Sequence, residues 1–243
     1  MALQDRQIGE IACDIPGATR VFHEHKLDFC CGGGHSLREA AAKRGADINV
    51  VTKALERLQE DASNTQNGAQ DWRDATPEAL IEHILRNFHD KHREQLPELL
   101  RLARRVEAVH GEKPGCPIGL ADHLAFMEQD MESHMMKEEQ ILFPMLLRGI
   151  YAQSLPPIMR MRHEHDQHGD SLTRLEQLTN DITPPPSACT TWRALYAGLA
   201  QLRDDLMQHI HLENNVLFLR IEKEAGGVVN ASAAGCSVCS VCS

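Results

Sequence analysis

The amino-acid sequence predicts an all-α protein, with a small N-terminal helical domain followed by an up-down bundle of four helices. Aromatic residues make up only 4% of the 243 residues, and few segments alternate polar and apolar residues, which argues against a β-rich fold. Four long stretches instead place apolar residues every three or four positions. Short connections containing Gly or Pro separate these stretches, as in an antiparallel bundle.

The first unit, residues 1–60, is expected to be a compact domain of short helices. Ser36 is followed three residues later by Glu39, a capping-box pattern that marks the start of a helix. Apolar spacing predicts a further helix over about 48–59. The polar stretch 61–71 contains no large apolar residue, so we interpret it as a linker that separates this domain from the bundle.

The bundle is predicted to occupy residues 72–224. Thr76 followed by Pro77 is a typical helix start, with Thr as the N-cap and Pro at the first helical position. The four helical patterns cover about 77–109, 119–148, 156–179 and 190–224.

Residues 225–243 carry no charge and are expected to form a flexible tail. The tail contains Cys236, Cys239 and Cys242 in a C-x-x-C-x-x-C spacing. Because this spacing lacks a fourth ligand, we expect no metal site there.

Charge and hydropathy exclude several classes of protein. The chain has 25 Lys and Arg against 35 Asp and Glu, a net charge of −10, which makes it a poor generic binder of nucleic acid. We find no apolar run long enough to span a membrane and no secretory signal at the N-terminus. We therefore expect a cytoplasmic protein, where the 8 cysteines stay reduced.

The second and fourth bundle helices place a His and a Glu where apolar residues belong. The second helix follows the spacing of a core-facing stripe, and its stripe residues are Leu120, Leu124, Met127, Met131, His134, Glu138, Ile141 and Met145. The fourth helix repeats the pattern with His209 and Glu213. Both Glu residues are thus expected in the core, one helical turn after a His.

The first and third helices each insert two histidines, His89 with His92 and His165 with His168. The two halves of the bundle also align with each other: the segment from His134 matches the segment from His209 at an offset of 75 residues. The bundle is therefore an internal repeat of two helix pairs.

A buried carboxylate is costly unless it is paired with a cation or bound to a metal. Two such carboxylates near core histidines, in a two-fold repeat, predict a cage of four His and two Glu suited to paired non-haem iron or manganese. In this cage Glu138 and Glu213 can bridge the two metals. Spacing alone does not decide which histidine of the first and third helices is the ligand. Glu164 and Asp130 are candidates for carboxylates that support the ligands.

Cys30 and Cys31 lie in a Gly-rich turn before Ser36. Adjacent cysteines rarely bond to each other without strain, so both thiols can stay available. The following glycines let a ligand or a partner approach the backbone closely. The pair is therefore a candidate for redox chemistry or iron binding, and the alternative is a buried turn packed with small residues.

These motifs together resemble the repair-of-iron-centres family, in which a hemerythrin-like di-iron bundle follows a domain with adjacent cysteines. The resemblance covers about residues 1–224. It is carried by Phe29-Cys30-Cys31-Gly32-Gly33, by the segment His89–Leu99, by His134–Pro144 and by Leu212–Phe218.

The resemblance implies two iron ions, with the ligands His89, His134, Glu138, His165, His209 and Glu213. It implies repair of iron–sulfur clusters damaged by nitric oxide or oxidants, through iron donation or nitric oxide handling, with Cys30 and Cys31 in transfer or partner contact. The partners expected are damaged iron–sulfur proteins and nitric oxide, and the expected assembly is a homodimer. The alternative is a protein that sequesters or senses nitric oxide without repair. A di-iron oxidase ranks last, because no substrate pocket is evident.

Overall fold

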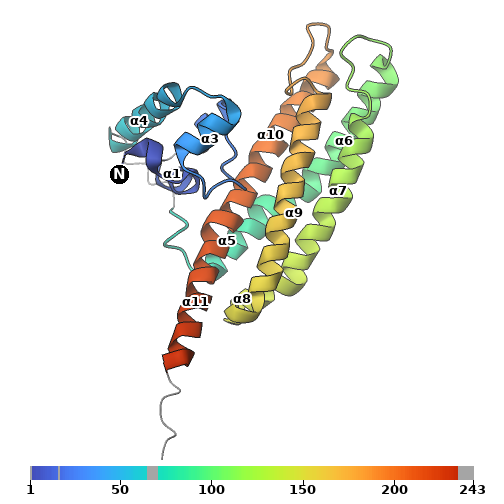
Figure 1. The fold of residues 1–243 in the computed structure, drawn as a ribbon. Coiled ribbons are helices and arrows are strands. Elements are labelled where there is room, and N and C mark those ends of the chain that lie inside the picture. Colours follow the sequence, from blue (N-terminus) through green and yellow to red (C-terminus); the bar gives the residue numbers. More distant parts are fainter. Residues whose placement is uncertain (1, 16, 65–70, 235–243) are drawn as a thin grey trace, which may run out of the picture.

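The computed structural model describes residues 2–15, 17–64 and 71–234. These residues form a cluster of short helices beside a bundle of long ones (Figure 1). No β-strand occurs within these ranges, and the prediction of an all-α fold is confirmed. None of the helices in the described part of the chain has the length and apolar character needed to cross a membrane.

Short helices build the N-terminal domain as the sequence predicts. Its elements are η1 (Leu3–Asp5), α1 (Ile8–Asp14), α2 (Ala18–Glu24), α3 (Leu37–Arg44) and α4 (Ile48–Asn64). The expected capping box is present, since Ser36 accepts a hydrogen bond from the Glu39 backbone and the Glu39 side chain accepts one in return. A buried apolar cluster, centred on Phe22 and Leu55, holds these helices together. Of the predicted linker, residues 65–70 lie outside the described residues.

Four antiparallel rods form the bundle, and three of them change helix type part-way. Their elements are α5 (Pro77–Ile84), η2 (Leu85–His89) and α6 (Asp90–His110); α7 (Leu120–Lys137), η3 (Glu138–Leu142) and α8 (Phe143–Leu147); α9 (Tyr151–Leu178); and α10 (Thr190–Leu212), η4 (Glu213–Leu217) and α11 (Phe218–Ala234). The rod of α6 packs against α7 and α10, whereas α9 packs against α7 and α11. The up-down arrangement is visible in Figure 1.

Two helix ends differ from the sequence prediction. Helix α9 begins at Tyr151 and carries Pro156 and Pro157 inside it. The residues one turn earlier, Ala152 and Gln153, are exposed, so water can bond the carbonyls that lose a donor at the two prolines. Helix α11 continues to Ala234, ten residues into the segment expected to be a flexible tail. The three tail cysteines, Cys236, Cys239 and Cys242, lie outside the described residues.

The N-terminal domain lies directly on the bundle rather than apart from it. Asn214 Nδ2 donates to the Cys30 carbonyl at 3.2 Å, and Asn215 Nδ2 donates to the Phe29 carbonyl at 3.0 Å and to that of Cys30 at 3.1 Å. The Phe29 ring packs edge-on against His211, with ring centres 5.6 Å apart. The cysteine turn therefore contacts the same helical rod that carries Glu213.

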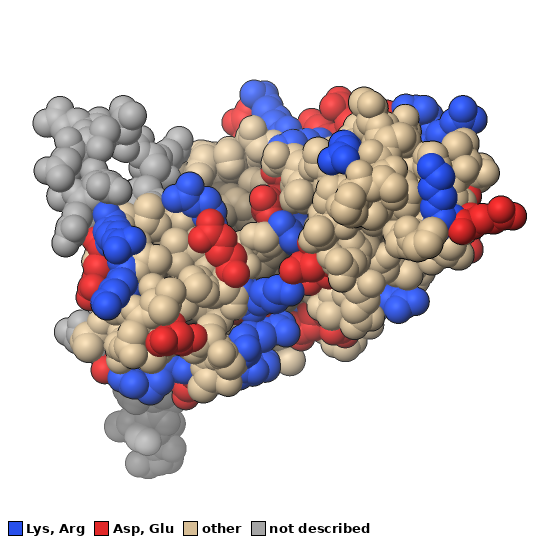
Figure 2. Space-filling view, turned by 90° about the horizontal axis from the view of Figure 1, so that it is seen from above, with Lys and Arg blue, Asp and Glu red and all other residues tan. Residues whose placement is uncertain are grey.

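Acidic and basic side chains are interspersed over the molecular face shown in Figure 2, including along the boundary between the N-terminal domain and the bundle. This mixed surface agrees with a charge balance that disfavours generic binding of polyanions.

Candidate metal centre

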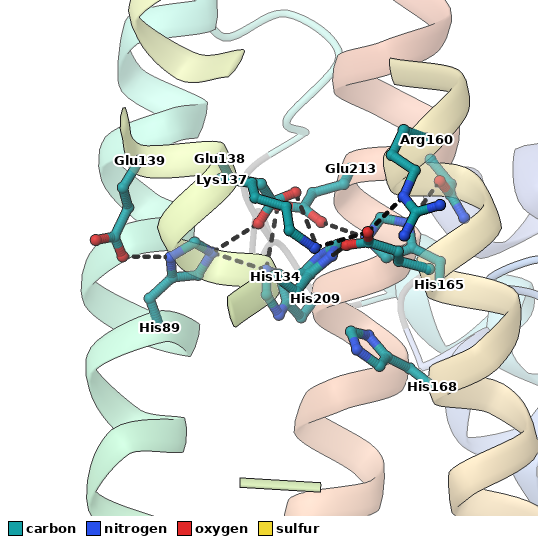
Figure 3. A network of polar contacts seen from close by, with 12 residues as sticks. His89, His134, Lys137, Glu138, Glu139, Arg160, His165, His168, His209 and Glu213 are labelled. Carbon is teal, nitrogen blue, oxygen red and sulfur yellow. Dashed lines mark hydrogen bonds and ion pairs between the residues drawn. The ribbon is translucent and has the colours of Figure 1, made fainter. Parts of the chain in front are cut away.

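The predicted ligands converge in the middle of the bundle, in two overlapping groups of four (Figure 3). One group is His89, Glu138, His209 and Glu213, and the other is His134, Glu138, His165 and Glu213. Within each group the candidate ligand atoms lie within 4.8 Å of one another, and every member is buried. Because both glutamates belong to both groups, the arrangement offers two candidate metal positions that share two carboxylates.

Each π-helical turn of the bundle has a predicted ligand at one end: η2 ends at His89, η3 begins at Glu138 and η4 begins at Glu213. A π turn takes in one extra residue and is often found at functional sites. It also shifts the buried stripe by one position. Ile141, predicted to face the core, is 54% exposed, whereas Leu142 is 1% exposed. The stripe prediction was therefore wrong beyond Glu138.

Imidazole nitrogens meet in pairs at the centre. His89 Nε2 lies 3.2 Å from His209 Nε2, and His134 Nε2 lies 3.1 Å from His165 Nε2. Two imidazoles that share one metal, with bonds of about 2.1 Å and angles between the octahedral and tetrahedral values, place their nitrogens about 3.0–3.4 Å apart. Each pair thus has the spacing of neighbouring ligands on a single ion.

The two glutamates carry buried oxygens that no hydrogen bond satisfies. Both carboxylate oxygens of Glu138 and Oε2 of Glu213 have no hydrogen-bond partner. His89 and His134 each approach Glu138 with an Nε2–oxygen distance of 3.4 Å, and His165 Nε2 is 3.1 Å from Glu213 Oε2. Buried carboxylates without good partners cost several kcal/mol. Together with the nitrogen spacings, these orphaned oxygens show that the donor set fits a pair of bound cations.

Three of the four histidines are oriented from outside by a side-chain acceptor. His89 Nδ1 donates to Glu139 Oε1 at 2.8 Å and His134 Nδ1 donates to Glu164 Oε2 at 2.9 Å. His165 Nδ1 bonds Asn214 Oδ1 at 2.8 Å, whereas the buried Nδ1 of His209 has no partner. Such outer bonds fix the ring and aim Nε2 at the metal.

The sequence prediction of Glu164 as a supporting carboxylate agrees with this geometry, but that of Asp130 does not. Asp130 Oδ2 lies 3.2 Å from His168 Nε2 rather than beside a ligand. The sequence reasoning missed Glu139 and Asn214. A signal was available, because each directly follows a shared glutamate and the two align in the 75-residue repeat.

The electrostatics of the site couple its histidines to its carboxylates. Burial disfavours the charged form of His134, but the carboxylates of Glu138 and Glu164 outweigh it and raise the pKa of His134 to about 10. Burial and the charge of Glu213 oppose ionisation of Glu138, yet the neighbouring His134 and His89 lower the pKa of Glu138 to about 2. Without metal, imidazolium protons balance the carboxylates, and metal binding must displace those protons.

The histidines that spacing left as alternatives differ in position. His92 and His168 are buried, but neither belongs to the two groups, whereas His89 and His165 each do. Burial is the main cause that lowers the pKa of both His92 and His168, and it therefore favours the neutral form of these two rings.

Cys30 and Cys31 lie outside the two groups. Their sulfurs are 3.9 Å apart, and the buried Cys30 Sγ donates to Asp28 Oδ1 at 3.4 Å. The hydrogen bond to Cys31 and the burial of the thiol raise the pKa of Cys30 well above its ordinary value. The Cys30 sulfur is therefore a protonated thiol in this state.

Residues 80–221 match the family described as the hemerythrin HHE cation binding domain. The chain belongs to this family. Residues 4–59 match a second family, ScdA_N, a domain of unknown function (DUF542). A hemerythrin HHE domain binds two irons, and the two overlapping His and Glu groups are suited to hold them. The family match and the two His and Glu groups confirm the predicted non-haem di-iron cofactor.

Similar proteins extend over nearly the whole chain. The iron–sulfur cluster repair protein YtfE of Dickeya chrysanthemi (strain Ech1591) is 52% identical over 220 residues, which cover 90% of this chain and 98% of that protein. The proteins of the same name from Escherichia coli O1:K1 / APEC and Escherichia fergusonii are 48% identical with the same coverage. The resemblance to the repair-of-iron-centres family, stated from sequence motifs, is thereby confirmed.

Proposed function

We propose that this protein repairs iron–sulfur clusters damaged by nitrosative or oxidative stress, using its non-haem di-iron centre. The observation that supports this most is the buried four-His, two-Glu donor set, arranged as two metal positions that share both carboxylates. It occurs in a chain that is 48–52% identical to relatives named iron–sulfur cluster repair proteins.

The proposed iron ligands are His89 and His209 on one iron and His134 and His165 on the other, with Glu138 and Glu213 bridging. Bound iron would supply labile, redox-active ions that can be donated to a damaged cluster or can bind nitric oxide. The chain itself orients the rings through Glu139, Glu164 and Asn214, and it keeps bulk water from the ligand oxygens by burying both glutamates completely.

Further parts of the proposal concern partners and place. Damaged iron–sulfur proteins are the proposed clients and nitric oxide a proposed ligand, while Cys30 and Cys31 act in transfer or in contact with the client. We also propose a cytoplasmic location. We further propose a homodimer, and sedimentation of the purified protein would test this oligomeric state.

The decisive experiment separates repair from sequestration. A hydro-lyase whose iron–sulfur cluster has already been damaged by nitric oxide is incubated with the iron-loaded protein, and regained activity and lost iron are measured together. Repair restores activity and consumes iron from the protein, whereas a Glu138→Leu variant restores none. If the protein only prevents damage in proportion to the amount added and revives nothing, the proposal fails and the nitric-oxide-binding alternative stands.

A further inference from the structure

A second group of metal-ligand residues lies outside the bundle core. A cavity of about 550 Å³ separates part of the N-terminal domain from the bundle, and Asp28, Cys30 and Cys31 line it together with Met207. The carboxylate oxygen and the two sulfurs lie within 4.8 Å of one another. None of the three side chains belongs to the di-iron groups.

The spacing of these atoms is that of a chelate. The two sulfurs are 3.9 Å apart, and Cys30 Sγ is 3.4 Å from Asp28 Oδ1. In a tetrahedral site with metal–sulfur bonds of about 2.3 Å and metal–oxygen bonds of about 2.1 Å, the corresponding edges are about 3.8 Å and about 3.6 Å. Two edges of a metal-binding tetrahedron are therefore already formed.

The turn is held in this shape by contacts on both sides. Asp28 Oδ1 accepts a hydrogen bond from the Cys31 backbone at 3.0 Å, which fixes the carboxylate beside the thiols. From the bundle, Asn214 and Asn215 anchor the Cys30 carbonyl. A Cβ at Gly32 would lie only 2.7 Å from the Asp28 carbonyl oxygen, so the tight return of the chain requires glycine there.

We propose that Asp28, Cys30 and Cys31 form a second metal site, for a single thiolate-preferring divalent cation such as ferrous iron. Binding forms two metal–sulfur bonds and one metal–oxygen bond, releases the two thiol protons to solvent, and leaves the oxidation state of the metal unchanged. Three protein ligands leave a fourth position free for water or a client ligand, as in catalytic metal sites.

Two thiolates and a carboxylate around a divalent ion leave one negative charge. The cavity lining carries charges of both signs, and its Lys26 and Arg203 already pair with Asp181 and Glu176. The Asn214 side chain connects the Cys30 carbonyl to the ring of His165. The claim that this site receives iron from the bundle rests on the proposed function. The claim that it binds a metal rests on its own geometry.

The test uses the full chain, loaded with iron in the bundle and carrying Cys236→Ser, Cys239→Ser and Cys242→Ser to remove competing thiols. Cobalt(II) is titrated in without oxygen, and thiolate-to-cobalt charge-transfer absorption is followed, because the His and Glu ligands of the bundle cannot produce it. We expect one cobalt per chain with this absorption and with the intense visible bands of tetrahedral cobalt. Addition of Cys30→Ser and Cys31→Ser should abolish it.

Two further variants sharpen the result. Asp28→Asn should keep the thiol count but shift the visible cobalt bands and weaken the titration, whereas Cys116→Ser, which changes a thiol elsewhere, should alter neither. Cobalt should also protect Cys30 and Cys31 from alkylation in the chain that retains them, a measurement that does not depend on a variant folding.

The site is refuted if the chain without tail cysteines shows no thiolate absorption, or if the absorption persists without Cys30 and Cys31. An Asp28→Asn variant that titrates unchanged refutes the carboxylate ligand. Cobalt binding with no repair of a damaged cluster would overturn the proposed function and leave the metal site standing.

Discussion

Asn214 offers a sharp test of whether a hydrogen bond from outside the metal centre supports a candidate histidine ligand. Its side chain is 3% exposed and makes two bonds of different kinds: Oδ1 bonds the ring of His165 at 2.8 Å, and Nδ2 donates to the Cys30 carbonyl at 3.2 Å. The neighbouring Asn215 anchors the same turn but contacts no ligand, since its ring contact is with His211. The two residues form a matched pair.

The size of the effect follows from which groups lose a partner. In Asn214→Ala the Cys30 carbonyl keeps its bond from Asn215 Nδ2 at 3.1 Å, so the main loss is at His165. One buried polar group left unpaired costs about 1–3 kcal/mol of folding free energy. Loss of an outer bond to a metal-bound histidine lowers metal affinity by about 10–100-fold. Asn215→Ala removes a partly buried bond to the Phe29 carbonyl, at a cost in stability but with no loss of iron affinity.

Iron affinity is measured by competition with a chromophoric chelator, and stability by urea denaturation of the metal-free proteins. We expect Asn214→Ala to release iron at about 10–100-fold lower chelator activity than the parent or Asn215→Ala. Asn214→Asp keeps an acceptor for His165 and should retain most of the affinity. Parent-like iron affinity in Asn214→Ala, or an equal loss in Asn215→Ala, would refute the role assigned to the bond between Asn214 and His165.

Four further outcomes are expected. Glu138→Leu and Glu213→Leu should each lose the paired iron centre while the helices persist in circular dichroism, and full loading of both would contradict the bridging assignment. Removal of iron should lower the melting temperature by roughly 8–16 °C, if the metal-bound state gains about 4 kcal/mol of folding free energy; calorimetry that finds equal temperatures would argue against a buried site. Cys30→Ser with Cys31→Ser should keep two irons per chain by metal analysis but lose cluster repair, and intact repair would leave the pair as turn residues. Removal of residues 235–243 should leave the iron content and its absorption spectrum unchanged; a lost metal would make the tail a ligand source.

The sequence alone determined the helical class and the two candidate glutamates. Local periodicity suffices for these, because a Glu at a position where the helix demands an apolar residue is conspicuous without any knowledge of the partner helix. Glu138 and Glu213 were identified in this way, and both are completely buried. The helix starts at Ser36 and Thr76 could also be predicted from local sequence, because each capping hydrogen bond joins residues only three positions apart.

Only the tertiary structure decided which histidines face each other and what supports them. Periodicity left His89 and His92 equivalent, the family resemblance implied His89, and in the structure His89 rather than His92 lies with Glu138 and His209. The bond between His165 and Asn214 joins residues 49 positions apart. The contact of Asn214 with Cys30 spans 184 positions. Ile141 was misplaced because a π turn takes in one extra residue and rotates the residues that follow, and the local pattern of apolar residues does not record that turn.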